Sequence, residues 1–362
     1  MTDRTFVVTG SHGLIGSALV RALCLDSATS VIGVDNNGRE EFFGTHGSTS
    51  PMGDRLVAEL PNYERHSVDV SDRKALWSLL TTRARQVAAI VHCAAQPSHD
   101  WAGANPCRDF DINAVGTINL LDWYRQHTPS IPFVFLSSNK VYSYQTVGSI
   151  TLVEHAERFD VSRDSPFWAG LTTDLSVGVG SRCLYGTSKL AADLLAQEYA
   201  YYFGLPITIL RCGSMTGPHH AAVALHGFVG YVAQQAAIGG RYEINGYSGK
   251  QVRDTLYYSD VIDAILSVIR AQPTVGPHIY NLGGGRDNAC SVLECLRFAV
   301  EESGKTVDIE VLPSPRLSDF RWWITDNRPF IEAHPNWRVR VSLRQMIAEA
   351  VSHMPTATPQ ST

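Results

Sequence analysis

The sequence predicts an α/β protein in which a doubly wound parallel sheet is followed by a smaller C-terminal α/β domain. Short apolar runs of strand length alternate with amphipathic stretches of helix length through the first 210 residues. A glycine-rich turn follows the first of these runs. After Gly217-Pro218 the alternation loosens, and Gly/Pro turns separate the later helical stretches. At 362 residues the chain is long enough for about two domains.

The apolar runs of the first part are rich in Val, Ile and Phe, and each is long enough to cross a sheet once. Because helices cover both faces of a parallel sheet, continuous apolar runs of this kind indicate buried strands. The intervening stretches carry apolar residues at spacings of three and four, which is typical of helices that cover a sheet. The expected strands are Phe6–Val8, Ser30–Val34, Ala89–His92, Phe133–Leu136 and Ile207–Leu210, and the expected helices are Leu14–Leu25, Arg73–Arg83, Ile112–His127 and Lys189–Phe203.

The second part completes the predicted domain organisation. We expect an N-terminal domain over residues 1–210, with residues 251–282 returning to it, and a substrate-binding domain over 211–250 and 283–352. Residues 353–362 are rich in Pro, Thr and Ser and are expected to form a disordered tail. Helices are expected near His226–Ile238, Asp260–Arg270 and Ser291–Glu302, and long loops beside the site over Asn37–Pro61 and Thr146–Gly180.

Composition and charge exclude several classes of protein. With 44% hydrophobic and 18% charged residues, the chain can bury a large apolar core, so widespread disorder is not expected. The formal net charge is -5, and no basic run could neutralise a nucleic-acid backbone. The seven cysteines show no metal-ligand spacing, the start leaves no room for a signal peptide, and no apolar run is long enough to span a membrane. We therefore expect a soluble, cytoplasmic protein without a metal, nucleic-acid or membrane partner.

The glycine-rich turn predicts a dinucleotide site of the Rossmann type. Thr9-Gly-Ser-His-Gly-Leu-Ile-Gly16 lies between the first strand and the first helix, where the backbone must turn tightly and approach a pyrophosphate. Asp35 ends the second strand 19 residues after Gly16, where its carboxylate would bind the adenosine ribose and favour NAD over NADP. The alternative is a plain turn followed by a helix cap. The predicted NAD-binding residues of this part are Gly10, Gly13, Leu14, Ile15, Gly16, Asp35, Asn36, Asp69 and Val70.

A second motif, formed by Tyr185 and Lys189, predicts proton transfer from a hydroxyl group. Tyr185 and Lys189 are four residues apart on an expected helix, so both side chains can point into one cleft. A nearby ammonium and an oxidised nicotinamide favour the phenolate of Tyr185, which can then take a proton from a sugar hydroxyl. Ser138, at the end of an earlier strand, would hydrogen-bond and orient that hydroxyl. The alternative is a Tyr and a Lys on a helix surface.

Together these motifs resemble the extended short-chain dehydrogenases/reductases of the NAD-dependent epimerase/dehydratase family. Asn139-Lys-Val-Tyr142 and Gly249-Lys-Gln-Val-Arg-Asp254 are in addition similar to the branch of CDP-paratose (CDP-tyvelose) 2-epimerase-like proteins. The resemblance implies a catalytic set of Ser138, Tyr185 and Lys189. It also implies NAD contacts by Ala94, Ala95, Gln96, Asn113, Ser137, Tyr185 and Lys189, and substrate contacts by Gln96, Asn139, Ser214, Arg253 and Arg316, with the two arginines on a diphosphate.

Several alternatives remain open on the sequence. Epimerisation of a nucleotide-sugar is favoured, and dehydration of a nucleoside or nucleotide-sugar would need an extra acid or base, for which Glu154, Asp174, His99, Cys212 and Lys140 are candidates. An NAD-binding regulator without activity is a third hypothesis. Adjacent His219 and His220 lack a third metal ligand, and Trp322 and Trp323 could stack on a base or pack in a core. The resemblance implies a homodimer formed through Ile112–His127 and Lys189–Phe203.

Overall fold

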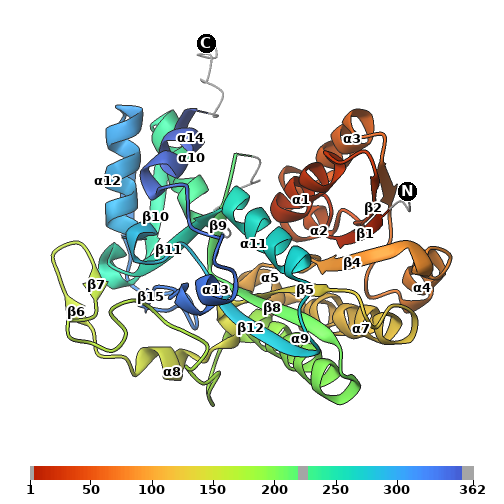
Figure 1. The fold of residues 1–362 in the computed structure, drawn as a ribbon. Coiled ribbons are helices and arrows are strands. Elements are labelled where there is room, and N and C mark those ends of the chain that lie inside the picture. Colours follow the sequence, from red (N-terminus) through yellow and green to blue (C-terminus); the bar gives the residue numbers. More distant parts are fainter. Residues whose placement is uncertain (1–3, 219–226, 353–362) are drawn as a thin grey trace, which may run out of the picture.

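The computed structural model describes residues 4–218 and 227–352. Within these residues a main sheet of seven parallel strands has the order β12-β8-β5-β4-β1-β2-β3 (Figure 1). The order reverses between β1 and β4, which is where such sheets open a crevice at the carboxyl ends of their strands. The predicted fold class is thereby confirmed. The strands are β1 (Arg4–Thr9), β2 (Thr29–Val34), β3 (Tyr63–His66), β4 (Val87–His92), β5 (Phe133–Ser138), β8 (Pro206–Cys212) and β12 (Gly276–Leu282).

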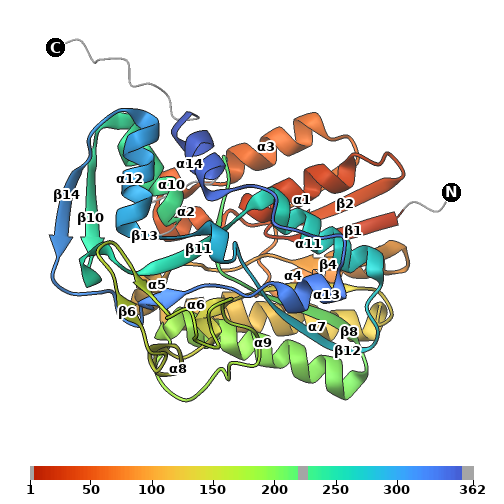
Figure 2. The ribbon, with the colours of Figure 1, turned by 60° about the vertical axis from the view of Figure 1, so that its left-hand side comes forward.

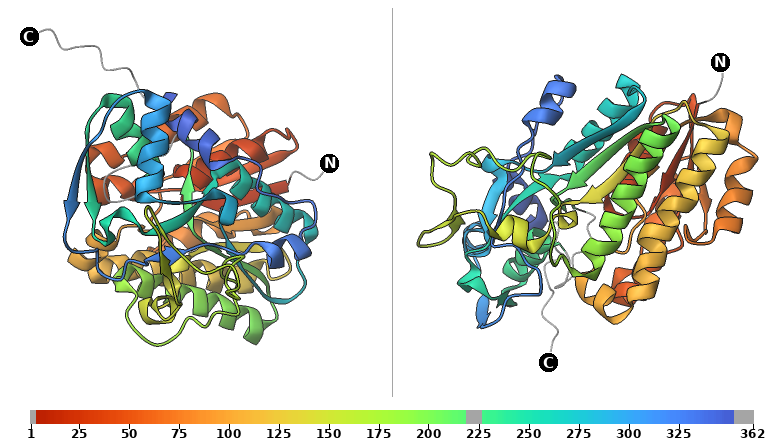
Figure 3. Two further views of the ribbon diagram at one scale, coloured as in Figure 1. Left: turned by 90° about the vertical axis from the view of Figure 1, so that its left-hand side faces the viewer. Right: turned by 90° about the horizontal axis from the view of Figure 1, so that it is seen from below.

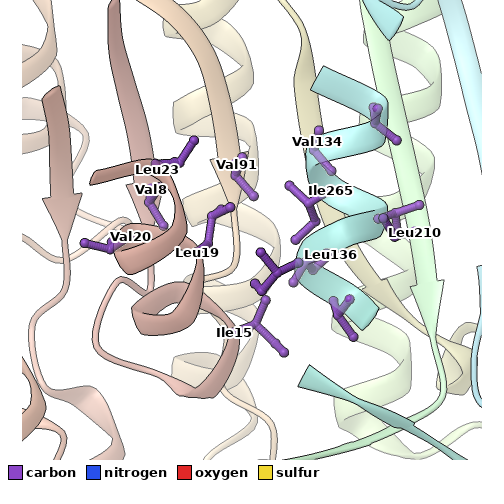
Figure 4. Close-up of a cluster of buried hydrophobic side chains, with 14 of the residues drawn as sticks. Val8, Ile15, Leu19, Val20, Leu23, Val91, Val134, Leu136, Leu210 and Ile265 are labelled. Atoms are coloured by element: carbon purple, nitrogen blue, oxygen red, sulfur yellow. The ribbon is translucent and has the colours of Figure 1, made fainter. Parts of the chain in front are cut away.

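Helices cover both faces of the main sheet (Figure 3). On one face, Ile15 and Leu19 of α1 and Ile265 of α11 are buried in one cluster with strand residues such as Val8 and Leu136 (Figure 4). Each fully buried side chain of this kind stabilises the fold by about 1.5–3 kcal/mol. This face carries α1 (Leu14–Cys24), α11 (Tyr258–Ala271) and α13 (Arg328–Ala333), and the other carries α4 (Arg73–Thr81), α7 (Gly116–His127) and α9 (Cys183–Phe203).

A second region lies beyond the carboxyl ends of the main strands (Figure 2). The chain leaves the main sheet after β8 and returns to it through α11 and β12, while β11 pairs with β9, β13 and β15. The predicted domain boundaries remain predictions, and residues 353–362 lie outside the described residues. The elements are β9 (Ser214–Thr216), α10 (Phe228–Ile238), β10 (Arg241–Asn245), β11 (Val252–Tyr257), β13 (Ala289–Ser291), α12 (Val292–Ser303), β14 (Asp308–Leu312), β15 (Trp322–Trp323) and α14 (Leu343–Ser352).

The expected loop over Asn37–Pro61 was wrong, because this segment contains α2 (Gly38–Phe43) and α3 (Ser50–Glu59). Helix α3 begins with a proline in its first turn, which suits a helix start, and buries little beyond Leu56 and Gly53. Such a short apolar stripe leaves a weak periodic signal. The segment Thr146–Gly180 is largely irregular, as predicted, apart from α8 (Tyr144–Gly148), β6 (Val153–Glu154) and β7 (Phe159–Asp160).

The helix expected from Ile112 begins earlier than predicted. It is preceded by α5 (His99–Ala104) and α6 (Pro106–Phe110), and a single π-helical turn, Asp111–Val115, joins α6 to α7. Turns of this type are rare and are frequent at functional sites. This one carries Asn113.

A buried ion pair fastens α9 to the main sheet. Arg211 of β8 donates from Nε and Nη2 to the carboxylate of Asp193 at 3.0 and 2.8 Å, and the two side chains are 6% and 0% exposed. Ser137 Oγ and Gln197 Nε2 donate to the same carboxylate, and Arg211 Nη1 donates to the hydroxyl of Tyr142. The charges are therefore extensively hydrogen-bonded, which a buried pair requires if it is to offset its desolvation cost.

We expect Asp193→Ala to lower the free energy of unfolding by about 3–5 kcal/mol, because it leaves the Arg211 guanidinium buried without its counter-ion. Glu154→Ala is the matched control, since the carboxylate that it removes from Lys250 is 61% exposed. That control should cost about 0–1 kcal/mol. Urea unfolding of both variants measures the free energy of unfolding. Equal losses in the two variants would contradict the conclusion that the buried pair stabilises the fold more than the exposed one.

Candidate active site

A cavity of about 1010 Å³ lies at the carboxyl ends of the main strands. Strands β1, β2, β4, β5 and β8 each end at or beside a lining residue, and β10 and β11 supply lining residues from the second region. Most residues predicted from the sequence line this cavity. They are Gly10, Gly13, Leu14, Ile15, Gly16, Asp35, Asn36, Asp69, Val70, Ala94, Ala95, Ser137, Ser138, Asn139, Tyr185, Lys189, Ser214, Arg253 and Arg316.

The glycine turn fits a dinucleotide. Gly10 has φ +66°, and a Cβ built on it would lie 2.8 Å from the backbone nitrogen of Ala94, so a side chain is excluded. A Cβ on Gly16 would collide with the carbonyl oxygen of Gly10. Gly13 precedes α1 without a side-chain cap, so the first N–H groups of the helix remain available to an anion. The close backbone packing and the helix start form a cradle that matches a pyrophosphate.

Asp35 is held in place by backbone donors. Its Oδ2 accepts from the N–H of His12 at 3.0 Å, and its Oδ1 accepts from the N–H of Asn37 at 2.8 Å. The buried imidazole of His12 lies 3.5 Å from Asp35 Oδ1 and contacts the hydroxyl of Tyr63 through Nε2. Burial lowers the pKa of His12, and the Asp35 charge opposes that effect. His12 was not among the predicted site residues, although it is part of the glycine motif.

Helix α2 is linked to the segment after β4 across the same end of the cavity. The ring of Phe42 packs on that of Trp101 of α5, with 4.7 Å between centroids. Arg108 of α6 donates to Asp69 at 2.5 Å and lies 3.7 Å from Glu41 of α2. These contacts connect the expected adenosine side of the cavity to α5 and α6.

The three predicted catalytic residues converge on the cavity. Tyr185 and Lys189 lie one turn apart in α9, and Ser138 ends β5. Lys189 Nζ donates to the carbonyl oxygen of Leu136 at 2.8 Å and lies 4.4 Å from the centroid of the Phe135 ring. The ammonium is therefore anchored on the strand that carries Ser138.

Burial governs the ionisation of these groups. It lowers the pKa of Lys189 to about 8, against the opposing charge of Asp193. It raises the pKa of Tyr185 above its usual range, and a hydrogen bond with Ser138 opposes that rise. The sequence-based expectation was that Lys189 would favour the phenolate, whereas in the protein alone desolvation dominates. The phenolate therefore needs further positive charge in the cavity, which an oxidised nicotinamide would supply.

Gln96 and Asn113 lie one layer behind the cavity wall rather than in it. The side chain of Asn113 accepts from the N–H of Gln96 at 3.0 Å and donates to its carbonyl at 3.1 Å, so it holds both backbone polar groups of Gln96. Both residues are buried. They therefore act on the neighbouring lining residues, Ala94 and Ala95, through the backbone.

The second region adds a cluster of charges to the cavity. Asp319 accepts from Arg253 Nη2 at 2.6 Å and lies 3.5 Å from Lys140 Nζ. Burial opposes ionisation of Asp319, but Arg253 and Lys140 outweigh it and hold its pKa at about 2. Burial lowers the pKa of Lys140, and the charge of Asp319 opposes that effect. The Asp319 pairing was not predicted, although Asp319 follows Arg316 in a motif that the sequence shows.

Other candidates lie away from the cavity. Trp322 and Trp323 are buried in the core, where Trp323 packs on Tyr142 and Phe320. Glu154 pairs with Lys250, and Asp174 contacts Thr172.

Residues 4–218 and 227–352 are the part of the chain that the structure describes. In that part of the chain we find no group of three or more His, Cys, Asp or Glu arranged to hold a metal. The helices described there include none that is long and apolar enough to cross a membrane. His219 and His220 lie outside the described residues.

Comparisons with known proteins agree with the geometry. The chain is 29% identical to the CDP-paratose 2-epimerase of Salmonella typhi over 351 residues, which cover 93% of this chain and 95% of that protein. It is 26% identical to dTDP-glucose 4,6-dehydratase 1 of Escherichia coli K12, over 77% of this chain and 71% of that protein.

A solved UDP-glucose 4-epimerase of Thermus thermophilus, in complex with NAD, superposes with a TM-score of 0.71 at 24% identity and covers 96% of this chain and 98% of that one. Residues 6–283 match the family described as NAD dependent epimerase/dehydratase. The site therefore belongs to an NAD-dependent enzyme of the extended short-chain dehydrogenase/reductase type, and the chain is a member of the NAD-dependent epimerase/dehydratase family.

Proposed function

We propose that the enzyme oxidises a hydroxyl of a nucleotide-linked or nucleoside sugar to a ketone and then returns the hydride, with no net redox change. The leading reaction is 2-epimerisation of a CDP-hexose-like substrate. The observation that supports this reaction type is that Ser138, Tyr185 and Lys189 line the same cavity as the glycine turn at Gly10. This proximity supports the proposal, because the proton acceptor and the hydride acceptor must act on the same alcohol group.

Each side chain has a distinct role in this proposal. Ser138 orients the reacting hydroxyl, and Tyr185 takes its proton and later returns it. Lys189 is fixed by Leu136 and contributes positive charge and a proton path beneath Tyr185. The glycine turn and Asp35 would hold NAD, whose nicotinamide would supply the hydride acceptor and donor.

Two features favour epimerisation over dehydration. Inversion by removal and return of a hydride at one carbon needs no further acid or base. In relatives that eliminate water, we expect an acid pair after the catalytic hydroxyl residue, whereas Ser138 is followed by Asn139 and Lys140. The similarity to CDP-paratose 2-epimerase over 93% of the chain points in the same direction.

Dehydration is the second candidate function, because residues that could act as the additional acid or base lie at the cavity. Of the five extra acid/base candidates, His99, Lys140 and Cys212 line the cavity. The ring of His99 stacks on that of Tyr185, with 5.3 Å between centroids. An imidazole at this distance could exchange a proton with the substrate region.

We also infer that the protein is a cytoplasmic homodimer. On α9, Leu194, Tyr201, Tyr202 and Phe203 are apolar or aromatic and exposed, which suits a paired-helix interface. All seven cysteines are free thiols, which suits a reducing compartment.

We expect Tyr185→Phe to reduce turnover by about 10²–10⁴-fold, the usual contribution of a general acid/base, while NAD affinity stays within a few fold. Tyr202→Phe, which removes an exposed hydroxyl on the same helix, is the control. Turnover and NAD binding are measured on both variants. Unchanged turnover in Tyr185→Phe would support an NAD-binding protein whose function does not use this site.

Proton NMR in D₂O, with NAD and a panel of CDP-, UDP- and dTDP-hexoses and nucleosides, tests the reaction. We expect inversion at one carbon without entry of solvent deuterium, because the hydride returns to the carbon that it left. Vinyl or deoxy-keto signals, or deuterium beside a ketone, would replace epimerisation by dehydration.

If the substrate carries a diphosphate, Arg253→Ala and Arg316→Ala should each raise KM by about 10- to 100-fold, since a hydrogen bond to a charged group contributes about 1.5–3 kcal/mol. Arg270→Ala changes an exposed arginine outside the cavity and serves as the control. Steady-state kinetics give KM for each variant. KM values equal to that of the control would indicate an unphosphorylated nucleoside.

A further inference from the structure

Asp109, at the end of α6, is a buried carboxyl that the proposed reaction does not use. It is 1% exposed, and it does not line the cavity. Its Oδ1 accepts from Asn113 Nδ2 at 3.0 Å, and its carboxylate also takes part in a side-chain hydrogen bond with Ser188. Ser188 lies in α9 between Tyr185 and Lys189.

The side chains next to Asp109 are hydrogen-bond donors. Asn113 Nδ2 donates to Asp109 Oδ1, and it also lies within hydrogen-bonding distance of the carbonyl of Gln96 at 3.1 Å and of Ser188 Oγ at 3.0 Å. The hydroxyl of Ser188 donates to the carbonyl of Tyr185 at 3.0 Å and also interacts with Asp109. A carboxylate accepts from these donors with a negative charge, which strengthens each bond, and it attracts the Lys189 ammonium. A protonated carboxyl loses that charge, so its hydrogen bonds and its attraction for Lys189 weaken.

We propose that Asp109 is a positioning residue. Its carboxylate holds the turn of α9 from Tyr185 to Lys189 against Asn113, whose side chain is hydrogen-bonded to the backbone of Gln96 behind the cofactor half of the cavity. The link runs from α6 through the π-helical turn to Gln96 and, through Ser188, to the carbonyl of Tyr185. Protonation of Asp109 loosens this link. The idea rests on the roles proposed above for Tyr185 and Lys189, but its primary test needs no substrate.

The charges around Asp109 decide when the link is intact. Burial raises the pKa of Asp109 to about 6, with Ser188, Lys189 and Asn113 opposing the rise. On α9 the charge of Asp109 also acts on Lys189, Tyr185 and Cys183.

The neighbouring charges on the other packed elements have their own partners. Arg108 of α6 turns away to Asp69 and Glu41, and Asp111 of the π-helical turn is exposed. His99 of α5 stacks on Tyr185. The carboxylate form of Asp109 therefore prevails above about pH 6, and the link weakens as the pH falls through that value.

The test uses full-length protein with NAD, labelled with ¹³C at the ζ carbon of tyrosine. The Tyr185 resonance is assigned by its loss in Tyr185→Phe and followed from pH 5 to 8. We expect an inflection near pH 6 in the wild type and none in Asp109→Asn. Asp111→Asn, which neutralises the exposed carboxylate nearby, should keep the inflection.

His99 needs its own control because an imidazole titrates in the same range. His99→Phe keeps a stacking ring and should retain the inflection. The proposal is overturned if the inflection of the Tyr185 resonance disappears in His99→Phe. It is also overturned if the inflection persists in Asp109→Asn or is absent from the wild type.

A second variant tests the proposal independently in case Asp109→Asn does not fold. Ser188→Ala removes a hydrogen bond that lowers the pKa of Asp109, so the inflection should move to higher pH. An unmoved inflection would contradict the proposed link.

Once a substrate is known, Asp109→Asn should lower kcat about tenfold to a hundredfold, leave KM within about twofold and remove the acidic limb of the pH profile. A loss confined to KM would contradict positioning.

Discussion

The buried ion pair between Asp193 and Arg211 sets the position of α9, and the geometry of the proposed catalytic residues follows from it. Removing two charges from water costs several kcal/mol each, so the pair is stable only in the one arrangement that hydrogen-bonds both groups. That arrangement fixes α9 in its register along β8. Lys189, one turn before Asp193, then reaches the carbonyl of Leu136. Tyr185, one turn before Lys189, then comes within hydrogen-bonding reach of Ser138 at the cavity.

Local patterns were sufficient for most of the main sheet. The five central strands are buried on both faces, so they are continuous apolar runs, and the helices between them carry a single apolar stripe. The edge strands β3 and β12 are only partly buried and were not among the expected strands. Prediction failed where burial is slight or comes from distant segments. Helix α3 buries little beyond Leu56 and Gly53, so it resembles a polar loop in sequence. The placement of β11 outside the main sheet depends on pairing with β9, β13 and β15, which are far apart in the chain.

In the site, too, features set by local sequence could be predicted, whereas those set by contacts between distant segments could not. The glycine turn and the Tyr185–Lys189 pair could be predicted because their chemistry is contained within one turn of chain. Asn113 and Gln96 were assigned to the cavity, yet they stand behind it, since a motif fixes which residues gather but not which layer each occupies. The pairing of Asp319 with Arg253 joins residues 66 positions apart, and no local pattern indicates it.

The charged groups at the two ends of the cavity are balanced differently, and this difference suits the reaction proposed above. Asp35 and Asp69 lie at the end expected to hold adenosine, where backbone and arginine donors fix them. Lys140 and Arg253 lie at the other end and share one carboxylate, that of Asp319. Lys140 and Arg253 with one counter-ion leave positive charge for an incoming anionic group, whereas the arginines at the other end, Arg39 and Arg108, lie beside Asp35 and Asp69. In the proposed reaction an anionic substrate would bind at the end that faces Tyr185, and the dinucleotide would stay bound because the hydride returns to the sugar.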